Sequence, residues 1–209
     1  MSMRKYIIVL LVLMSVIPCM GQQEFYRDKG GMSLMYSSAH LQDGGTSGSY
    51  GASMSFKGGF TAAIASAEIG DETKPQVMAG FISKPTTSKP AYARSSVMVS
   101  YLSVGSANIV GVNTGLAYLI NAQRQFPTSI NGGLAINYIF KNTDGGSFDN
   151  EASGSNLVPI ANIAVTQALF NRSTLTPFLS TGLGYDLTNS QSFWMVGLGV
   201  NVNFNGKLE

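Results

Sequence analysis

Residues 193–204 read FWMVGLGVNVNF, and this stretch decides the fold class. Its even-numbered residues, from Trp194 to Phe204, are large and apolar. The odd-numbered residues between them are small or polar, apart from Met195. Because successive side chains of a strand point to opposite faces, this alternation predicts a strand with one apolar face. A strand of a soluble sandwich can alternate in the same way. A terminal strand bracketed by aromatic residues is more typical of a transmembrane β-barrel, in which the last strand pairs with the first.

The composition favours the membrane alternative. The chain has 209 residues, a formal net charge of +2 and only 11% charged residues, against about 25% in a typical soluble domain. No internal run approaches the roughly 20 consecutive apolar residues that a membrane helix needs. Low charge without long apolar runs is what alternating membrane strands produce. The near-neutral balance and the lack of a basic stripe argue against a nucleic-acid partner.

The N-terminus has the pattern of an export signal. Arg4 and Lys5 precede the apolar run Tyr6–Ile17, and small residues follow near Gly21, so we predict a signal peptide over residues 1–21 and a barrel domain over residues 22–209. Acylation of Cys19, the single cysteine, is an alternative that Pro18 fits poorly. Cleavage after Gly21 leaves a chain without cysteine, and therefore without a disulfide or a cysteine metal site.

The alternation continues along the chain and predicts an all-β, closed, antiparallel up-and-down barrel of about ten strands. Eight strands are the alternative, because Phe60–Glu68 is rich in alanine and Val77–Ser83 is short. The loop Ile69–Gln76 and the proline-containing segment Lys84–Pro90 interrupt the sheet. The predicted strands are Gly31–Leu41, Ser49–Lys57, Phe60–Glu68, Val77–Ser83, Arg94–Val104, Asn108–Ile120, Ser129–Lys141, Pro159–Phe170, Thr174–Leu187 and Phe193–Phe204.

An orientation follows if the first strand rises from the periplasm. The loops Gln42–Gly48 and Asn142–Asn156 then face outward, and the turns Gly58-Gly59 and Asn171–Ser173 face the periplasm, with long loops outside as barrels favour. This arrangement sorts the outward aromatic residues into two belts, which membrane interfaces favour. The outer belt would hold Tyr36, Tyr50, Tyr101, Tyr138, Tyr185 and Trp194, and the inner belt Phe56, Phe60, Phe81, Tyr118, Phe170 and Phe204.

A family resemblance rests on the last third of the chain. The segment PFLSTGLGYDL (residues 177–187), the turn after it and the terminal FWMVGLGVNVNF strand resemble the closing hairpin of small outer-membrane β-barrels of the OmpA/OmpX/opacity-type superfamily. The resemblance implies the outer membrane of a Gram-negative-type bacterium and contact with its lipid. It specifies no ligand and no oligomeric state, because members of the superfamily include structural, adhesive, protective and narrow-pore proteins.

The side chains that could carry chemistry are few. His40 is the single histidine, near Ser37, Ser38 and Asp43, and a His–Ser pair at the outer rim occurs in outer-membrane acyltransferases and lipases. Serines are abundant throughout the chain, so acyl transfer by His40 is only a distant alternative, and we expect a protein that is not an enzyme and binds no cofactor. One histidine excludes a His₂ or His₃ zinc site.

The loop Asn142–Asn156 carries Asp144, Asp149 and Glu151, three carboxylates that could gather around calcium. Their spacing does not match an EF-hand. We therefore expect a solvated outer loop, available to a surface ligand or partner protein, and no metal site.

The predicted inward face is small and almost uncharged. Its polar residues include Asn113, Asn131, Asn137, Asn162, Asn201 and Asn203, and its charges are mainly Lys57 and Asp186. Such residues can pack into a closed, hydrogen-bonded interior, which we favour, or leave a narrow channel for small uncharged or apolar solutes. The leading prediction is a non-enzymatic outer-membrane barrel with a structural or surface-interaction role through its outer loops. Gln167 breaks the outward apolar face, and the sequence does not explain it.

Overall fold

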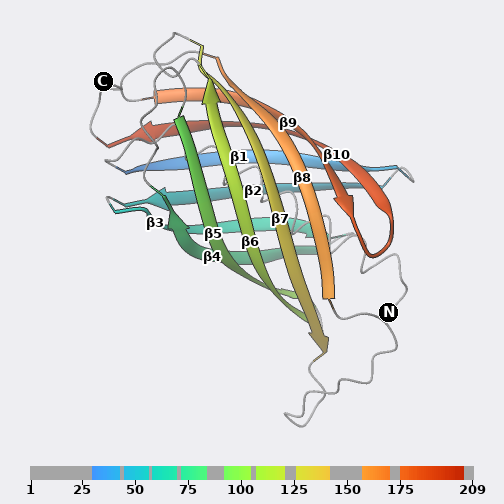
Figure 1. The fold of residues 1–209 in the computed structure, drawn as a ribbon. Coiled ribbons are helices and arrows are strands. Elements are labelled where there is room, and N and C mark those ends of the chain that lie inside the picture. The colour runs from blue at the N-terminus through green and yellow to red at the C-terminus, as the bar shows by residue number, and fades with distance from the viewer. Residues whose placement is uncertain are drawn as a thin grey trace.

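Ten strands follow one another along the chain and close into an antiparallel barrel (Figure 1). The computed structural model describes residues 30–42, 45–56, 58–69, 72–83, 92–104, 107–120, 126–141, 157–169 and 175–204. Each strand pairs with its neighbours in sequence, and the last pairs with the first, so the predicted barrel of ten strands is confirmed and the alternative of eight is wrong. The strands are β1 (Gly31–Leu41), β2 (Thr46–Ser55), β3 (Phe60–Ile69), β4 (Glu72–Ile82), β5 (Tyr92–Val104), β6 (Ala107–Ile120), β7 (Thr128–Lys141), β8 (Leu157–Ala168), β9 (Leu175–Asp186) and β10 (Gln191–Asn203).

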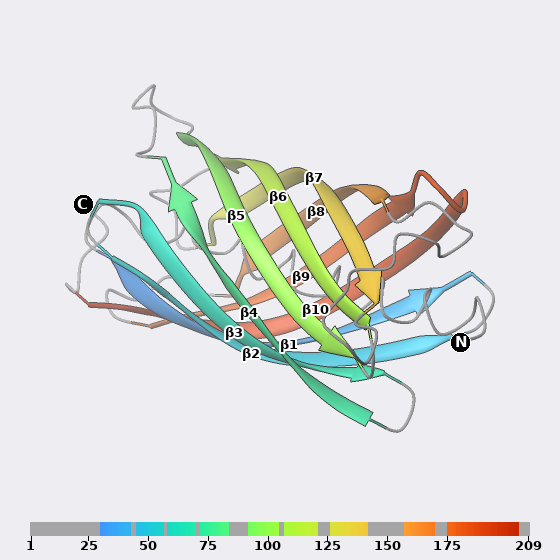
Figure 2. The same cartoon turned by 90° about the horizontal axis from the view of Figure 1, so that it is seen from below.

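The sheet closes with a large stagger. Following paired residues once around the barrel from Leu157, the first residue of β8, leads to Leu169, directly after the end of β8 and twelve residues further along. A stagger of this size requires strongly tilted strands, which Figure 2 shows crossing one another on the two walls of the barrel. The row of outward residues on this path is Leu157, Tyr138, Val110, Tyr101, Val77, Ile64, Ala52, Leu34, Val200, Pro177 and Leu169.

Strand β4 is longer than its sequence indicates. We predicted a loop over Ile69–Gln76, but β4 begins at Glu72 and pairs with β3 along its whole length, including Pro75 opposite Ser66. On its other side β4 pairs with β5 only from Gln76 onward. Pro75 has no N–H to donate, but β5 is not paired with β4 at this position, so no hydrogen bond to β5 is lost. The proline is therefore tolerated close to the end of the paired region.

The turn between β2 and β3 is the tight one predicted at Gly58-Gly59. Both glycines have positive φ, 107° and 91°, which glycine adopts without steric cost. The turn is closed by Phe56 N donating to Phe60 O at 2.8 Å and by Gly59 N donating to Phe56 O at 3.0 Å.

The connections at the two ends of the barrel do not show the general contrast in length that the predicted orientation requires. The end at which odd-numbered strands finish is called the upper end, and the opposite end the lower end. The upper connections comprise residues 42–45, 70–71, 105–106, 142–156 and 187–190, and the lower ones residues 56–59, 83–91, 121–127 and 169–174. Apart from residues 142–156, the upper connections are no longer than the lower ones, so the expected general contrast is absent.

Several predictions fall on residues outside the described ranges. These are the signal peptide over residues 1–21, the loops Lys84–Pro90 and Asn142–Asn156 with Asp144, Asp149 and Glu151, the turn Asn171–Ser173, and the positions of Lys57 and Phe170. They remain predictions.

The outer face of the barrel is apolar on every strand. Exposed fractions of 40–65% are found at mid-strand residues such as Leu34, Ile64, Leu134, Leu183 and Leu198. The residues between them face inward and are mostly buried. An apolar band of this kind around a closed sheet is the surface that a transmembrane barrel presents to lipid.

Candidate functional site

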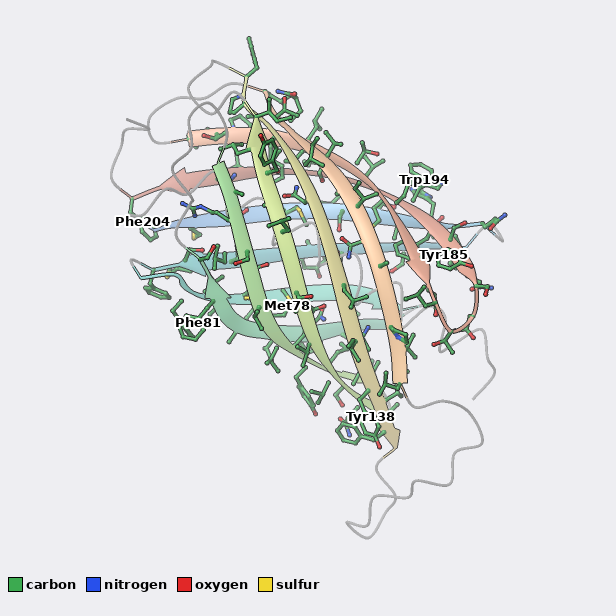
Figure 3. All side chains as sticks on the ribbon, viewed as in Figure 1. Met78, Phe81, Tyr138, Tyr185, Trp194 and Phe204 are labelled. Carbon is green, nitrogen blue, oxygen red and sulfur yellow. The ribbon has the colours of Figure 1, made fainter. Side chains whose placement is uncertain are left out.

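The interior of the barrel is packed with larger side chains than the sequence led us to expect. Met35, Met78, Met98 and Phe178 lie in one buried cluster with Ala63 and Ala65, and Met78 is labelled near the middle of the barrel in Figure 3. Further toward the upper end, Leu102, Ile109 and Ile160 are fully buried. The prediction of an inward face lined by small residues is therefore incomplete.

Two glycines make room for aromatic rings inside the barrel. A Cβ added to Gly184 would overlap the ring of Phe193, and one added to Gly199 would overlap the ring of Phe178 and the carbonyl oxygen of Leu34. Gly184 of β9 and Gly199 of β10 thus allow the aromatic ring at the paired position of the neighbouring strand to lie against the glycine. Phe178 and Phe193 are 1% and 4% exposed as a result.

Polar groups inside the barrel mostly bond across neighbouring strands. Ser37 and Ser49 hydroxyls lie 2.9 Å apart, and those of Ser55 and Thr61 lie 3.0 Å apart. Asn113 Nδ2 donates to Ser100 Oγ at 3.2 Å. Such bonds offset the cost of burying hydroxyl and amide groups.

The predicted interior asparagines lie in different surroundings. Asn113, Asn137 and Asn201 are buried at 6%, 1% and 0% exposure. Asn131 and Asn162 line, with Asn113, a small cavity of about 40 Å³, a size at which one or two waters fit. The side chain of Asn203 is outside the described residues. The amides of Asn137 and Gln76 have no hydrogen-bond partner among the described residues.

Of the two charges predicted for the interior, Asp186 is buried there and Lys57 lies outside the described residues, and the structure adds Arg94. Asp186 is 2% exposed, and its carboxylate accepts hydrogen bonds from the backbone N–H groups of Thr188 and Asn189 at 2.8 and 3.1 Å, so it closes the β9–β10 turn. Arg94, which the sequence reading missed, is 9% exposed on the inward side of β5. Arg94 has an even number, and the even-numbered residues of β5 face inward. The alternation in the sequence could therefore have placed Arg94 inside the barrel.

Gln167 breaks the outward apolar face for a local reason. Its Oε1 accepts from Thr128 Oγ1 at 2.7 Å, and its Nε2 donates to Pro127 O at 3.2 Å and to Ala168 O at 3.0 Å. The side chain thus satisfies its polar groups against the start of β7 and does not present them to the surroundings of the barrel.

Most of the aromatic residues predicted for the belts are exposed on the outer face, and Figure 3 shows the labelled ones at opposite ends. Tyr138, Tyr185 and Trp194 lie toward the upper end, which is on the right in Figure 3, and Phe81 and Phe204 lie toward the lower end, on the left. Tyr101 lies near the upper end of its strand, and Phe56, Phe60 and Tyr118 near the lower end of theirs. Tyr36 and Tyr50 instead face each other in the middle of β1 and β2.

His40 lies on the outer face near the upper end of β1, and not in the lumen. Its ring stacks on Trp194 of β10, with ring centroids 4.1 Å apart and ring planes 15° apart. Its Nε2 lies 3.2 Å from Ser38 Oγ, and its Nδ1 lies 3.3 Å from Thr46 Oγ1 on β2. Ser37 points inward to Ser49, so the structure pairs His40 with Ser38 and not with Ser37.

No group of three or more His, Cys, Asp or Glu side chains that could hold a metal occurs among the described residues. In the same part of the chain, no helix has the length and apolar character needed to cross a membrane.

The comparisons with known proteins report similarity in fold alone. No protein-family model and no curated protein sequence matches the chain. Among solved structures, Neisserial surface protein A is 12% identical, with a TM-score of 0.40, 84% of this chain covered and 96% of that one. The N-terminal barrel domain of Pseudomonas aeruginosa OprF is 14% identical, with a TM-score of 0.38 and coverages of 84% and 98%. The outer-membrane enzyme PagL is 10% identical, with a TM-score of 0.41 and coverages of 82% and 99%.

These likenesses are too weak to transfer an activity. The identity of the molecule rests on its own architecture: ten antiparallel strands, complete closure and an apolar outer face on every strand. The protein is a closed antiparallel β-barrel of ten strands, and its apolar outer face is of the kind that a transmembrane barrel presents to lipid.

Proposed function

We propose that the protein is a closed barrel that conducts no solute and serves a structural or surface-interaction role at its upper end. The observation that carries the proposal is the packed lumen, in which Met98, Leu102 and Phe178 are at most 1% exposed. Interiors packed in this way leave few voids larger than a water molecule, which argues against the narrow channel that the sequence also allowed.

The upper end is proposed to face the cell exterior because it carries the longest connection, residues 142–156. Barrels in the outer membrane place their longest loops outside. A surface ligand or a partner protein would then meet this loop, which contains both carboxylates and small polar residues.

Conductance separates the closed barrel from a channel. Purified protein in a planar lipid bilayer is expected to give no steady current steps. A variant with Met78→Ala, Met98→Ala and Phe178→Ala, which removes the cluster from the lumen, should pass more ions than wild type. Steady current steps of equal size in both proteins would contradict the proposal that the barrel is closed.

Labelling of intact cells tests the orientation. A short epitope tag inserted between Asp149 and Asn150 should bind antibody without permeabilisation. The matched control is the same tag inserted in the lower connection at residues 121–125, which should bind antibody only after the outer membrane is opened. The reverse result would place residues 142–156 in the periplasm and overturn a surface role for them.

A further inference from the structure

The outer face of the barrel carries one imidazole held between two hydroxyl groups. Ser38 and His40 are two residues apart on β1 and therefore share a face, and Thr46 lies opposite His40 on β2. The Nε2–Ser38 Oγ distance is 3.2 Å and the Nδ1–Thr46 Oγ1 distance is 3.3 Å. Each ring nitrogen thus has a different hydroxyl partner.

Either neutral tautomer of the ring satisfies both contacts, because each hydroxyl can donate or accept, and one of the two leaves Nε2 as the base. With the proton on Nδ1, the ring donates to Thr46 Oγ1, and Nε2 is left to accept from the Ser38 hydroxyl. The stack against Trp194 on the opposite side of β1 fixes the plane of the ring. A nucleophile, a base and a group that orients the base are the parts that hydroxyl-based acyl transfer requires.

An apolar groove lies next to this group on the same outer face. It crosses β9, β10, β1, β2, β3 and β4, and its lining includes Leu34, Tyr36, Tyr50, Ile64, Leu179 and Leu198. Along β1 the outward side chains run Leu34, Tyr36, Ser38 and His40, so the groove begins one outward position below Ser38. The surrounding face is apolar on every strand, which places the groove among lipid acyl chains.

We infer that Ser38 and His40 form a nucleophile–base pair that cleaves acyl esters of membrane lipids, with the acyl chain lying in the groove and Thr46 as a positioning residue for the imidazole. The sequence led us to expect no enzyme, and the geometry adds an activity to the structural role. The inference does not depend on whether the barrel conducts.

The reaction balances with water as the second substrate. Ser38 Oγ attacks the ester carbonyl carbon while His40 Nε2 takes the hydroxyl proton. The ester C–O bond then breaks, and His40 returns that proton to the departing alcohol oxygen. Water attacks the acyl–serine ester with its proton passing to Nε2, and the fatty acid leaves as Ser38 regains its proton.

Ser38 is tested directly with an alkyl fluorophosphonate, which forms a phosphorus–oxygen bond to a nucleophilic serine and releases fluoride. The refolded full chain in phosphatidylcholine vesicles should carry the adduct at Ser38, as peptide mass spectrometry detects. His40→Gln should slow adduct formation by about 100-fold or more, the usual contribution of a general base. Thr46→Val should slow it less, and Thr46→Ser should restore it.

Ser37→Ala is the matched control, because Ser37 lies one residue away but faces the lumen and bonds Ser49. It should label at the wild-type rate. The heat-shifted gel mobility of folded barrels shows which variants fold. The inference fails if folded wild type carries no adduct at Ser38, or if His40→Gln labels as fast as wild type.

The substrate class is tested with nitrophenyl esters in detergent micelles. Wild type should hydrolyse the palmitoyl ester faster than the acetyl ester, and Ser38→Ala should hydrolyse neither above the rate of micelles alone. Equal rates for the two esters would overturn the role of the groove. Equal rates for wild type and Ser38→Ala would overturn the role of the serine.

Discussion

Replacing Leu198 with arginine is expected to destabilise the folded barrel in lipid by about 2–4 kcal/mol, the cost measured for arginine on the lipid face near the bilayer midplane. Leu198 is 55% exposed on the outer face of β10. It lies in the middle of the strand, between Leu179 on β9 and Tyr36 on β1. Neither paired position carries a carboxylate, so a guanidinium there would find no opposite charge across the strand pair.

Leu187→Arg is the matched control for this prediction. Leu187 is exposed to a similar extent, 51%, but lies in the β9–β10 turn at the upper end. The same substitution near the interface should cost only about 0–1 kcal/mol. Urea unfolding in lipid vesicles, followed by the fluorescence of Trp194, the single tryptophan, measures both. Equal costs for the two variants would mean that β10 does not lie in the membrane as proposed.

The strands themselves could be predicted because their signal is local. Alternation with a period of two is written within each segment and needs no knowledge of the neighbours. The exception, the first part of β4, shows the limit of this rule. Residues Glu72, Lys74 and Pro75 have poor strand propensity, and it is pairing with β3 that makes them extended.

The packing of the lumen could not be predicted in the same way. Alternation places Met98 and Phe178 on the inward side, but it does not say which glycine on another strand lies beneath each of them. That match depends on the register across the barrel, as for Phe178 over Gly199. A prediction made strand by strand therefore identified the small inward residues. It missed the large inward side chains that lie over the glycines of neighbouring strands.

The residues around His40 were also predictable only where their position depends on local spacing and not on strand register. Ser38 shares its face because of a two-residue spacing that the sequence displays. Thr46 and Trp194 reach the ring only because β2 and β10 flank β1 in a particular register. The sequence could therefore nominate a serine and a histidine, whereas the orienting hydroxyl and the stacked ring required the closed barrel.

The largest expected loss of stability follows from truncating the centre of this closed interior. Phe178→Ala should cost about 3–5 kcal/mol, as for other buried aromatic residues replaced by alanine. Phe178 is 1% exposed and packs in one cluster with Met35, Met78 and Met98. Its ring lies over Gly199, which has no side chain to fill the space that truncation leaves. Collapse around the cavity is therefore limited, which places the cost toward the upper part of the range.

Phe81→Ala removes the same atoms from the opposite side of the wall and is the matched control. Phe81 is 62% exposed on the outer face, and its ring meets Phe60 edge-on at 5.6 Å. Lipid replaces most of its contacts, so only the ring pair is lost, about 0.5–1.5 kcal/mol. Urea unfolding of both variants in the same vesicles gives the comparison. If Phe178→Ala cost no more than Phe81→Ala, the lumen would not be packed, and the proposal of a closed barrel would lose the observation on which it rests.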